Sequence, residues 1–320
     1  MENKKTALIV EGGGQRGVFS FGITDTFIKR DYDPFDIYIG VSNGVAVLCW
    51  YLIRETDNNL EKMLYAARGD YLDYKNIFTG GDIIKFHKMY EDGEKMFKPN
   101  MEKIRKTVEG KKYIAVVTDA LSAQAEYHEF GDDEWMPKMI ASGTLPVLVR
   151  TPSMIDGRRK FDGGVADPLP VRKAYELGAK RIIVIRTYEE KFKRKLKLEN
   201  YIGAFFSKEY PELRKALLKH DKTYNTALDF IHNPPSDCEV IQLCPPTRLK
   251  SKRDSKNVDI LKADYNLGQR IAENYLSNLE NWLQKLVNLI FNQGSCFRWK
   301  CIKSMICSRY NYNLSIRTIT

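Results

Sequence analysis

The chain has 320 residues, of which 43% are hydrophobic and 29% charged, and its formal net charge is +10. This composition is typical of a globular protein with a sizeable core and excludes an intrinsically disordered chain. Residues 291–320 hold five Lys or Arg and no acidic residue, so half of the positive excess lies there. No recognition motif accompanies the charge, and we expect no nucleic-acid partner.

Two strand–turn–helix units open the chain. Residues 6–10 form a short apolar run that ends in glycines, and residues 18–30 follow with helical spacing. Residues 35–39 predict a second strand, and after a turn residues 45–54 predict an apolar helix. This alternation is typical of an α/β fold with a parallel-rich central sheet and helices on both faces.

The rest of the chain continues the α/β pattern. Residues 57–110 predict mostly helices. Further strands are expected at 113–118, around Lys160, at 181–186 and at 239–243. Residues 245–256 are rich in proline and charge and predict a linker, and residues 258–290 predict one long amphipathic helix or two.

Ser42 stands at the centre of the sequence Gly40-Val41-Ser42-Asn43-Gly44, between a predicted strand and an apolar helix. The two flanking glycines allow the sharp turn that projects a serine hydroxyl above the edge of a sheet. The positive N-terminus of the following helix would point toward that hydroxyl. The pattern predicts a nucleophilic serine, although glycines in an ordinary tight turn give the same letters by chance.

A glycine-rich loop follows the first strand, and its residues are Gly12, Gly13, Gly14, Gln15, Arg16 and Gly17. Consecutive glycines expose backbone N–H groups that can stabilise an oxyanion, although a tight turn without chemistry is an open alternative. The same letters match the dinucleotide pattern Gly-x-Gly-x-x-Gly, but that pattern needs an acidic residue at the end of the next strand, and Asp36 lies near its start. A phosphate-binding P-loop is excluded because Val18 and Phe19 replace its Lys and Ser or Thr.

Asp162 ends the strand predicted around Lys160 and is followed by Gly163 and Gly164. The strand would deliver a carboxylate, and two glycines permit close backbone approach. Asp-Gly is also a common turn dipeptide, so this motif gains meaning only beside a serine that needs a base.

The histidines offer no better base. His87, His128, His220 and His232 lie outside glycine-bounded turns and strand ends, and the charged helical sequence around the last two predicts surface positions. A carboxylate that acts directly on Ser42 is therefore favoured. The six cysteines form no Cys-x-x-Cys pair and show no zinc spacing with histidine, so we expect free thiols, no metal and no cofactor.

The three motifs, at residues 12–17, 40–44 and 162–164, resemble in order and spacing those of the patatin-like phospholipases. The resemblance runs from about residue 7 to residue 186 and includes the segment 141–146 before the aspartate strand. The stretch 265–268 is similar to the C-terminal extension of bacterial members. Asn43 departs from the small residue common in the family, and the tail after Ile290 matches nothing in it.

The resemblance implies a serine acyl-hydrolase that cleaves lipid carboxyl esters, phospholipid or lysophospholipid, through a Ser–Asp dyad without histidine. Ser42 would attack the ester carbonyl and Asp162 would accept its proton. The implied oxyanion hole comprises Gly12, Gly13, Gly14, Arg16 and Gly17, with Arg16 expected to brace the loop. The resemblance implies no metal and no cofactor.

We expect a patatin-like catalytic domain over residues 1–245, a helical C-terminal extension over 246–290 and a basic, cysteine-containing tail over 291–320. The absence of a visible signal peptide or membrane span predicts a cytoplasmic protein. Residues 189–230 mix lysines with aromatic residues, which suits peripheral contact with an anionic membrane. An ordinary amphipathic helix packed on the core gives the same pattern. The oligomeric state stays open.

Two other functions remain open. A histidine-dependent α/β-hydrolase esterase would use Ser42, Asp162 and either His220 or His232, in the usual chain order. A non-catalytic nucleotide-binding module would use the glycine loop over residues 12–17.

Overall fold

The computed structural model describes residues 4–56, 59–131, 134–146 and 148–291. Its strands are Lys5–Val10 (β1), Ile37–Val41 (β2), Lys112–Asp119 (β3), Ala125–Glu129 (β4), Ser153–Ile155 (β5), Arg158–Asp162 (β6), Ala179–Ile185 (β7) and Glu239–Leu243 (β8). They form one sheet with the order β5-β6-β3-β2-β1-β7-β8, and β4 also pairs with β3. Strands β1, β2, β3, β7 and β8 are parallel neighbours, whereas β4, β5 and β6 pair antiparallel.

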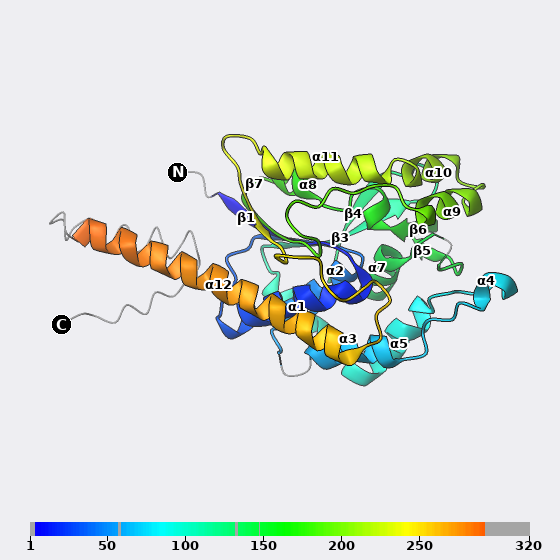
Figure 1. The fold of residues 1–320 in the computed structure, drawn as a ribbon, viewed down its shortest axis with the longest axis horizontal. Coiled ribbons are helices and arrows are strands. Elements are labelled where there is room, and N and C mark those ends of the chain that lie inside the picture. The colour runs from blue at the N-terminus through cyan, green and yellow to red at the C-terminus, as the bar shows by residue number, and fades with distance from the viewer. Residues whose placement is uncertain (1–3, 57–58, 132–133, 147, 292–320) are drawn as a thin grey trace.

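Helices cover both faces of this sheet. They are Gly17–Lys29 (α1), Asn43–Ile53 (α2), Asn59–Arg68 (α3), Asn76–Thr79 (α4), Phe86–Phe97 (α5), Met101–Thr107 (α6), Trp135–Gly143 (α7), Val171–Glu176 (α8), Leu198–Phe206 (α9), Pro211–Leu217 (α10), His220–His232 (α11) and Val258–Phe291 (α12). Figure 1 shows α8 and α11 on one side of the sheet and α1 and α12 on the other. The predicted α/β fold with a parallel-rich sheet and a C-terminal helix is confirmed.

The central strand β1 explains why the first apolar run has no polar alternation. Leu8 and Val10 belong to the core that α1, α2 and α12 cover, while Ala7 and Ile9 belong to the core beneath α8 and α11. Successive side chains of a strand point to opposite faces, so a strand covered on both sides is apolar throughout. The glycines that follow therefore mark the point where the chain leaves the sheet.

Helix α12 is one continuous helix rather than two, and it lies directly on α1. The approach is very close because glycines face backbone at the crossing. A Cβ placed at Gly268 would lie 2.1 Å from the Phe19 carbonyl oxygen, and one at Gly22 would lie 2.1 Å from the Tyr265 carbonyl oxygen. Tyr265 also donates a hydrogen bond to buried Asp25, at 2.5 Å.

The main differences from the predicted elements concern strands. Strand β2 lies two residues later than expected, because Phe35 packs in the core before the strand begins, and it runs directly into Ser42. Strands β4 and β5 were not predicted, since they are short and only partly buried, without an apolar run. Among the described residues no helix is both long and apolar enough to cross a bilayer.

Candidate active site

A pocket of about 1170 Å³ opens where several strands end. Gly12 follows β1, Ser42 follows β2 and Thr187 follows β7, while Asp162 is the last residue of β6. All four line this pocket. The carboxyl ends of parallel strands are the usual place for a ligand crevice in open α/β sheets.

Ser42 occupies the strained turn that its motif predicts. Its φ of 54° and ψ of −129° place it in a region that non-glycine residues rarely adopt. The turn is held because the Ser42 N–H donates to the Ser142 hydroxyl at 2.9 Å, and that hydroxyl donates to the Val116 carbonyl at 2.7 Å. Ser42 also directly precedes α2, whose positive N-terminus therefore faces the pocket.

Hydrogen bonds hold both the backbone and the side chain of Asp162, and the residue is only 4% exposed. Its N–H donates to the Thr144 carbonyl and its carbonyl accepts from the Thr118 hydroxyl, both at 2.8 Å. Its Oδ1 accepts from the Gly164 N–H, also at 2.8 Å. Burial raises the pKa of Asp162 to about 6, although a side-chain hydrogen bond from Ser42 and the bond from Gly164 oppose that rise. The Ser42 side chain therefore lies near enough to Asp162 to act on its pKa.

The glycine loop lies against the serine turn. A Cβ at Gly12 would lie 2.7 Å from the Ser42 Cβ, so only glycine permits this approach. The N–H groups of Gly13 and Gly14 have no acceptor in the part of the chain that the structure describes, and both residues line the pocket. The Asn43 side chain donates to the Gly14 carbonyl at 3.0 Å, so this departure from the family pattern ties loop and turn together.

Arg16 braces the loop. Its Nε donates to the Thr187 hydroxyl at 3.3 Å, and its guanidinium lies 4.3 Å from the centre of the Tyr188 ring. Gly17, Gly40, Gly44 and Gly163 lie behind the pocket, not on its wall. At Gly44, for example, a Cβ would lie 2.2 Å from the Val10 carbonyl oxygen, so glycine is needed for α2 to sit on β1.

Glu11 lies directly before the glycine loop and binds Thr187 and Tyr224. Its role in the site was not predicted from the sequence. Glu11 is 3% exposed, and it accepts hydrogen bonds from the Thr187 N–H at 2.6 Å and the Tyr224 hydroxyl at 2.8 Å. An acidic residue directly after the apolar run at residues 7–10 was the available signal.

The segment 246–257, predicted as part of a linker, forms a wall of the pocket. Arg248, Lys250, Lys252 and Arg253 all line it. The Arg253 carbonyl accepts from the Gln15 N–H at 2.9 Å, which docks this segment on the glycine loop. Its guanidinium lies 3.5 Å from the Glu199 carboxylate on α9 and lowers the pKa of Asp162 slightly against the effect of burial.

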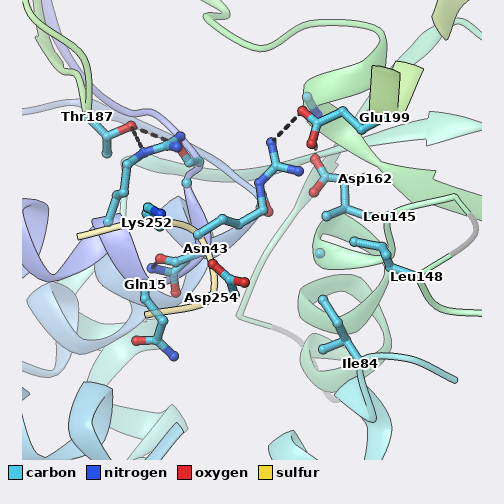
Figure 2. A pocket seen from close by; sticks show the side chains of 18 of the residues that line it. Gln15, Asn43, Ile84, Leu145, Leu148, Asp162, Thr187, Glu199, Lys252 and Asp254 are labelled. Atoms are coloured by element: carbon cyan, nitrogen blue, oxygen red, sulfur yellow. Dashed lines mark hydrogen bonds and ion pairs between the residues drawn. The ribbon is translucent and has the colours of Figure 1, made fainter. Parts of the chain in front are cut away.

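The pocket has two chemically different walls. Its apolar wall includes Met63, Ile84, Phe86, Met89, Leu145 and Leu148. Its basic wall includes Arg194, Lys197, Lys250, Lys252 and Arg253. Figure 2 shows Ile84, Leu145 and Leu148 grouped on one side and Lys252 on the other, with Asp162 at the upper edge. Such a pocket fits a molecule with one long apolar part and one polar or anionic part.

His220 contradicts the expected surface position. It is half-buried and lines the pocket, whereas His232 is exposed as expected. Burial lowers the pKa of His220 to about 3, so the ring is neutral, although a hydrogen bond to the Val165 backbone favours its charged form. The acidic side chain that meets Ser42 is Asp162, and Asp162 is held by Gly164 rather than by this histidine.

Other ligand chemistry finds little support within the described ranges. They contain no group of three His, Cys, Asp or Glu residues arranged to hold a metal ion. Cys49, Cys238 and Cys244 are free, and the three tail cysteines lie outside the described residues. Asp36 accepts from the Thr6 N–H at 2.8 Å, at the opposite end of β1 from the glycine loop, where it could not bind a nucleotide ribose.

Two family models match parts of this chain. Residues 8–175 match the patatin-like phospholipase family model, and residues 210–284 match a domain of unknown function, DUF6363. The uncharacterized protein YjjU of Escherichia coli strain K12 is 26% identical over 284 residues, covering 86% of this chain and 78% of that protein. VipD from Legionella pneumophila is a structural neighbour with a TM-score of 0.43 and 12% identity, covering 86% of this chain and 67% of VipD.

The patatin-like match contains the glycine loop, the Ser42 turn and Asp162, and it spans more than half of the chain. The chain therefore belongs to the patatin-like phospholipase family, a family of lipid acyl-hydrolases.

Proposed function

We propose that this protein hydrolyses lipid carboxyl esters, with Ser42 as the nucleophile and Asp162 as its general base. The observation that carries the proposal is that the strained Ser42 turn and the buried Asp162 carboxyl group meet in one pocket, where Ser42 helps to lower the pKa of Asp162 against the effect of burial. A pKa of about 6 leaves the Asp162 carboxylate ionised at neutral pH and makes it a stronger base than an ordinary aspartate.

In the first step the Ser42 Oγ attacks the ester carbonyl carbon while its proton passes to Asp162. The negative charge on the former carbonyl oxygen is stabilised by the N–H groups of Gly13 and Gly14, each worth about 3 kcal/mol by analogy with other oxyanion holes. The intermediate then collapses and breaks the bond to the alcohol, which leaves with the proton held by Asp162.

In the second step water attacks the acyl group on Ser42, and Asp162 accepts the water proton. Collapse of this intermediate releases the carboxylic acid and returns the proton to Ser42 Oγ. The apolar wall fits an acyl chain, and the basic wall fits the phosphate of a phospholipid or lysophospholipid.

The rival histidine mechanism has one observation in its favour, which is that His220 lines the same pocket. Its neutral ring is the correct form for a base. However, a Ser–His–Asp arrangement needs the aspartate behind the histidine, and here Ser42, not His220, is among the causes that act on the pKa of Asp162. The direct dyad therefore explains the geometry better.

The test is labelling with an active-site fluorophosphonate, comparing wild type with Ser42→Ala, Asp162→Asn and His220→Gln. We expect labelling at Ser42, none in Ser42→Ala, and a rate at least about 100-fold lower in Asp162→Asn. The wild-type rate should fall as the pH is lowered through about 6, because protonated Asp162 cannot accept the serine proton.

His220→Gln is the matched control, since it changes another titratable residue of the same pocket. The dyad predicts that it keeps its labelling rate within a few-fold. Near-wild-type labelling of Asp162→Asn would refute the dyad, and a loss in His220→Gln as large as in Asp162→Asn would favour the histidine mechanism.

A further inference from the structure

An ordinary surface helix buries its large apolar side chains, whereas helix α9 exposes them. Its large apolar side chains point to solvent, and we call them the α9 face: Leu198 (74% exposed), Tyr201 (53%), Ile202 (42%), Phe205 (56%) and Phe206 (56%). Residues spaced by three and four positions share one side of a helix, so these five form a single surface. The side packed on the protein consists of Asn200, Gly203 and Ala204.

The α9 face is continuous with the pocket. Ile202 and Phe206 also line it, and Gly203 packs against Leu217, which lies on its wall. The ion pair of Glu199 and Arg253 joins α9 to the opposite rim. A surface that binds the α9 face would therefore lie at the mouth of the pocket.

Basic residues surround the same mouth. Residues 189–208 hold six Lys or Arg and three acidic residues, and residues 246–257 hold five Lys or Arg and one acidic residue. Lysines 191, 193, 195 and 197, directly before α9, are all exposed, as are Lys250 and Lys252 across the pocket. Lys208 lies 4.2 Å from the Phe205 ring centre and extends the basic rim past the helix end.

We propose that α9 is an interfacial helix that docks the protein on an anionic phospholipid bilayer and turns the pocket toward it. The α9 face enters the boundary between headgroups and acyl chains, and the surrounding lysines contact anionic headgroups. This deepens the proposed function, since it names the surface from which a lipid reaches Ser42. Helix α9 lies between the two segments that match known families, so the inference depends on this chain's own residues.

The experiment measures flotation of the full chain with phosphatidylcholine vesicles, with and without phosphatidylglycerol, at low and high salt. The test variant is Leu198→Ser/Tyr201→Ser/Phe205→Ser, because these three residues belong to the α9 face without lining the pocket. The control is Trp282→Ser, an aromatic residue 49% exposed on α12.

We expect wild type and Trp282→Ser to float with anionic vesicles at low salt, and the triple variant to bind at least about tenfold more weakly. Binding should weaken at high salt and without phosphatidylglycerol. Wild-type protein that stays unbound to anionic vesicles, or a triple variant that binds as wild type does, would overturn the proposal. A concentration-dependent dimer that only the triple variant loses would instead assign the α9 face to a second copy of the chain.

Fluorophosphonate labelling without vesicles separates this inference from the proposed function. The triple variant should label at Ser42 like wild type, which also shows that it is folded. Vesicle binding without any labelling would support the membrane-docking role of α9 and refute the proposed hydrolase. Labelling without vesicle binding would support the hydrolase and refute the membrane-docking role.

Discussion

Asp162 places a carboxyl group where only 4% of the residue is exposed, and burial raises its pKa to about 6 from an ordinary 3.8. A folded-state pKa above the unfolded one means that ionisation works against folding. The cost is complete above about pH 6, shrinks as the pH falls toward 4, and vanishes where the group is protonated in both states. A shift of this size corresponds to roughly 3 kcal/mol.

We therefore expect Asp162→Asn to melt at a higher temperature than wild type at pH 8. The amide is neutral and its oxygen can still accept the Gly164 N–H. The difference in melting temperature should shrink as the pH is lowered from 6 to 4. Thermal unfolding followed by circular dichroism at several pH values measures both effects.

Asp119→Asn is the opposite control. Burial raises the pKa of Asp119, but hydrogen bonds from Lys160 and Ser122 outweigh it and hold the pKa below its usual range. Loss of this carboxylate leaves the fully buried Lys160 with one partner fewer, so Asp119→Asn should melt lower at pH 8. A gain in Asp162→Asn that does not vary with pH would contradict the argument.

At the residue scale, the sequence predicted the site residues that lie next to glycines. Ser42 and Asp162 lie beside glycines at strand ends, and such turns can be recognised in the sequence from their glycines. Ser142 and Thr118 hold these two residues in place, yet each is one hydroxyl in an otherwise unremarkable segment. Their roles depend on which strands become neighbours, which no local pattern states.

At the scale of elements, the crossing of α1 and α12 depends on glycine at the point of contact. Gly268→Ala would place a methyl group 2.1 Å from the Phe19 carbonyl oxygen, so the helices must separate. We expect the free energy of unfolding to fall by about 1–3 kcal/mol, as in other overpacked cores, measured by urea titration.

Gly93→Ala supplies the comparison within α5. A Cβ there meets only the Tyr65 ring at 3.8 Å, an ordinary contact, so better helix propensity should raise stability by about 0.5–1 kcal/mol. Equal stability of Gly268→Ala and wild type would show that the two helices can move apart without cost.

Elements with a clear apolar run or a clear period were predicted well, and elements with neither were not. The helices α1, α2 and α12 and the strands β1, β3, β7 and β8 lie close to their expected positions because burial imposes a clear pattern. Segment 246–257 has no period and looks like a linker. Its charges are explained only by its place on the pocket wall.

On the scale of the whole molecule, the order of the strands in the sheet determines which residues line the pocket. Strand β1 lies between β2 and β7, so the loops after these three strands converge although Thr187 is far from Ser42 in the chain. The sequence predicted a parallel sheet but could not give this order. For that reason it located Ser42 and Asp162, placed His220 beside them only in an alternative mechanism, and missed Glu11 and Arg253 as residues of the same pocket.

The central position of β1 has a consequence for synthesis on the ribosome. Ile9 pairs with Ile39 on one side but with Val184 on the other, and α1 packs against α12 as well as against α2 and α3. Strand β1 therefore gains its β7 neighbour, and α1 its α12 neighbour, only after residues 179–185 and 258–291 have been translated. Contacts this distant in sequence slow folding and prolong exposure of apolar surface. The growing chain should accordingly rely on chaperones until α12 has left the exit tunnel.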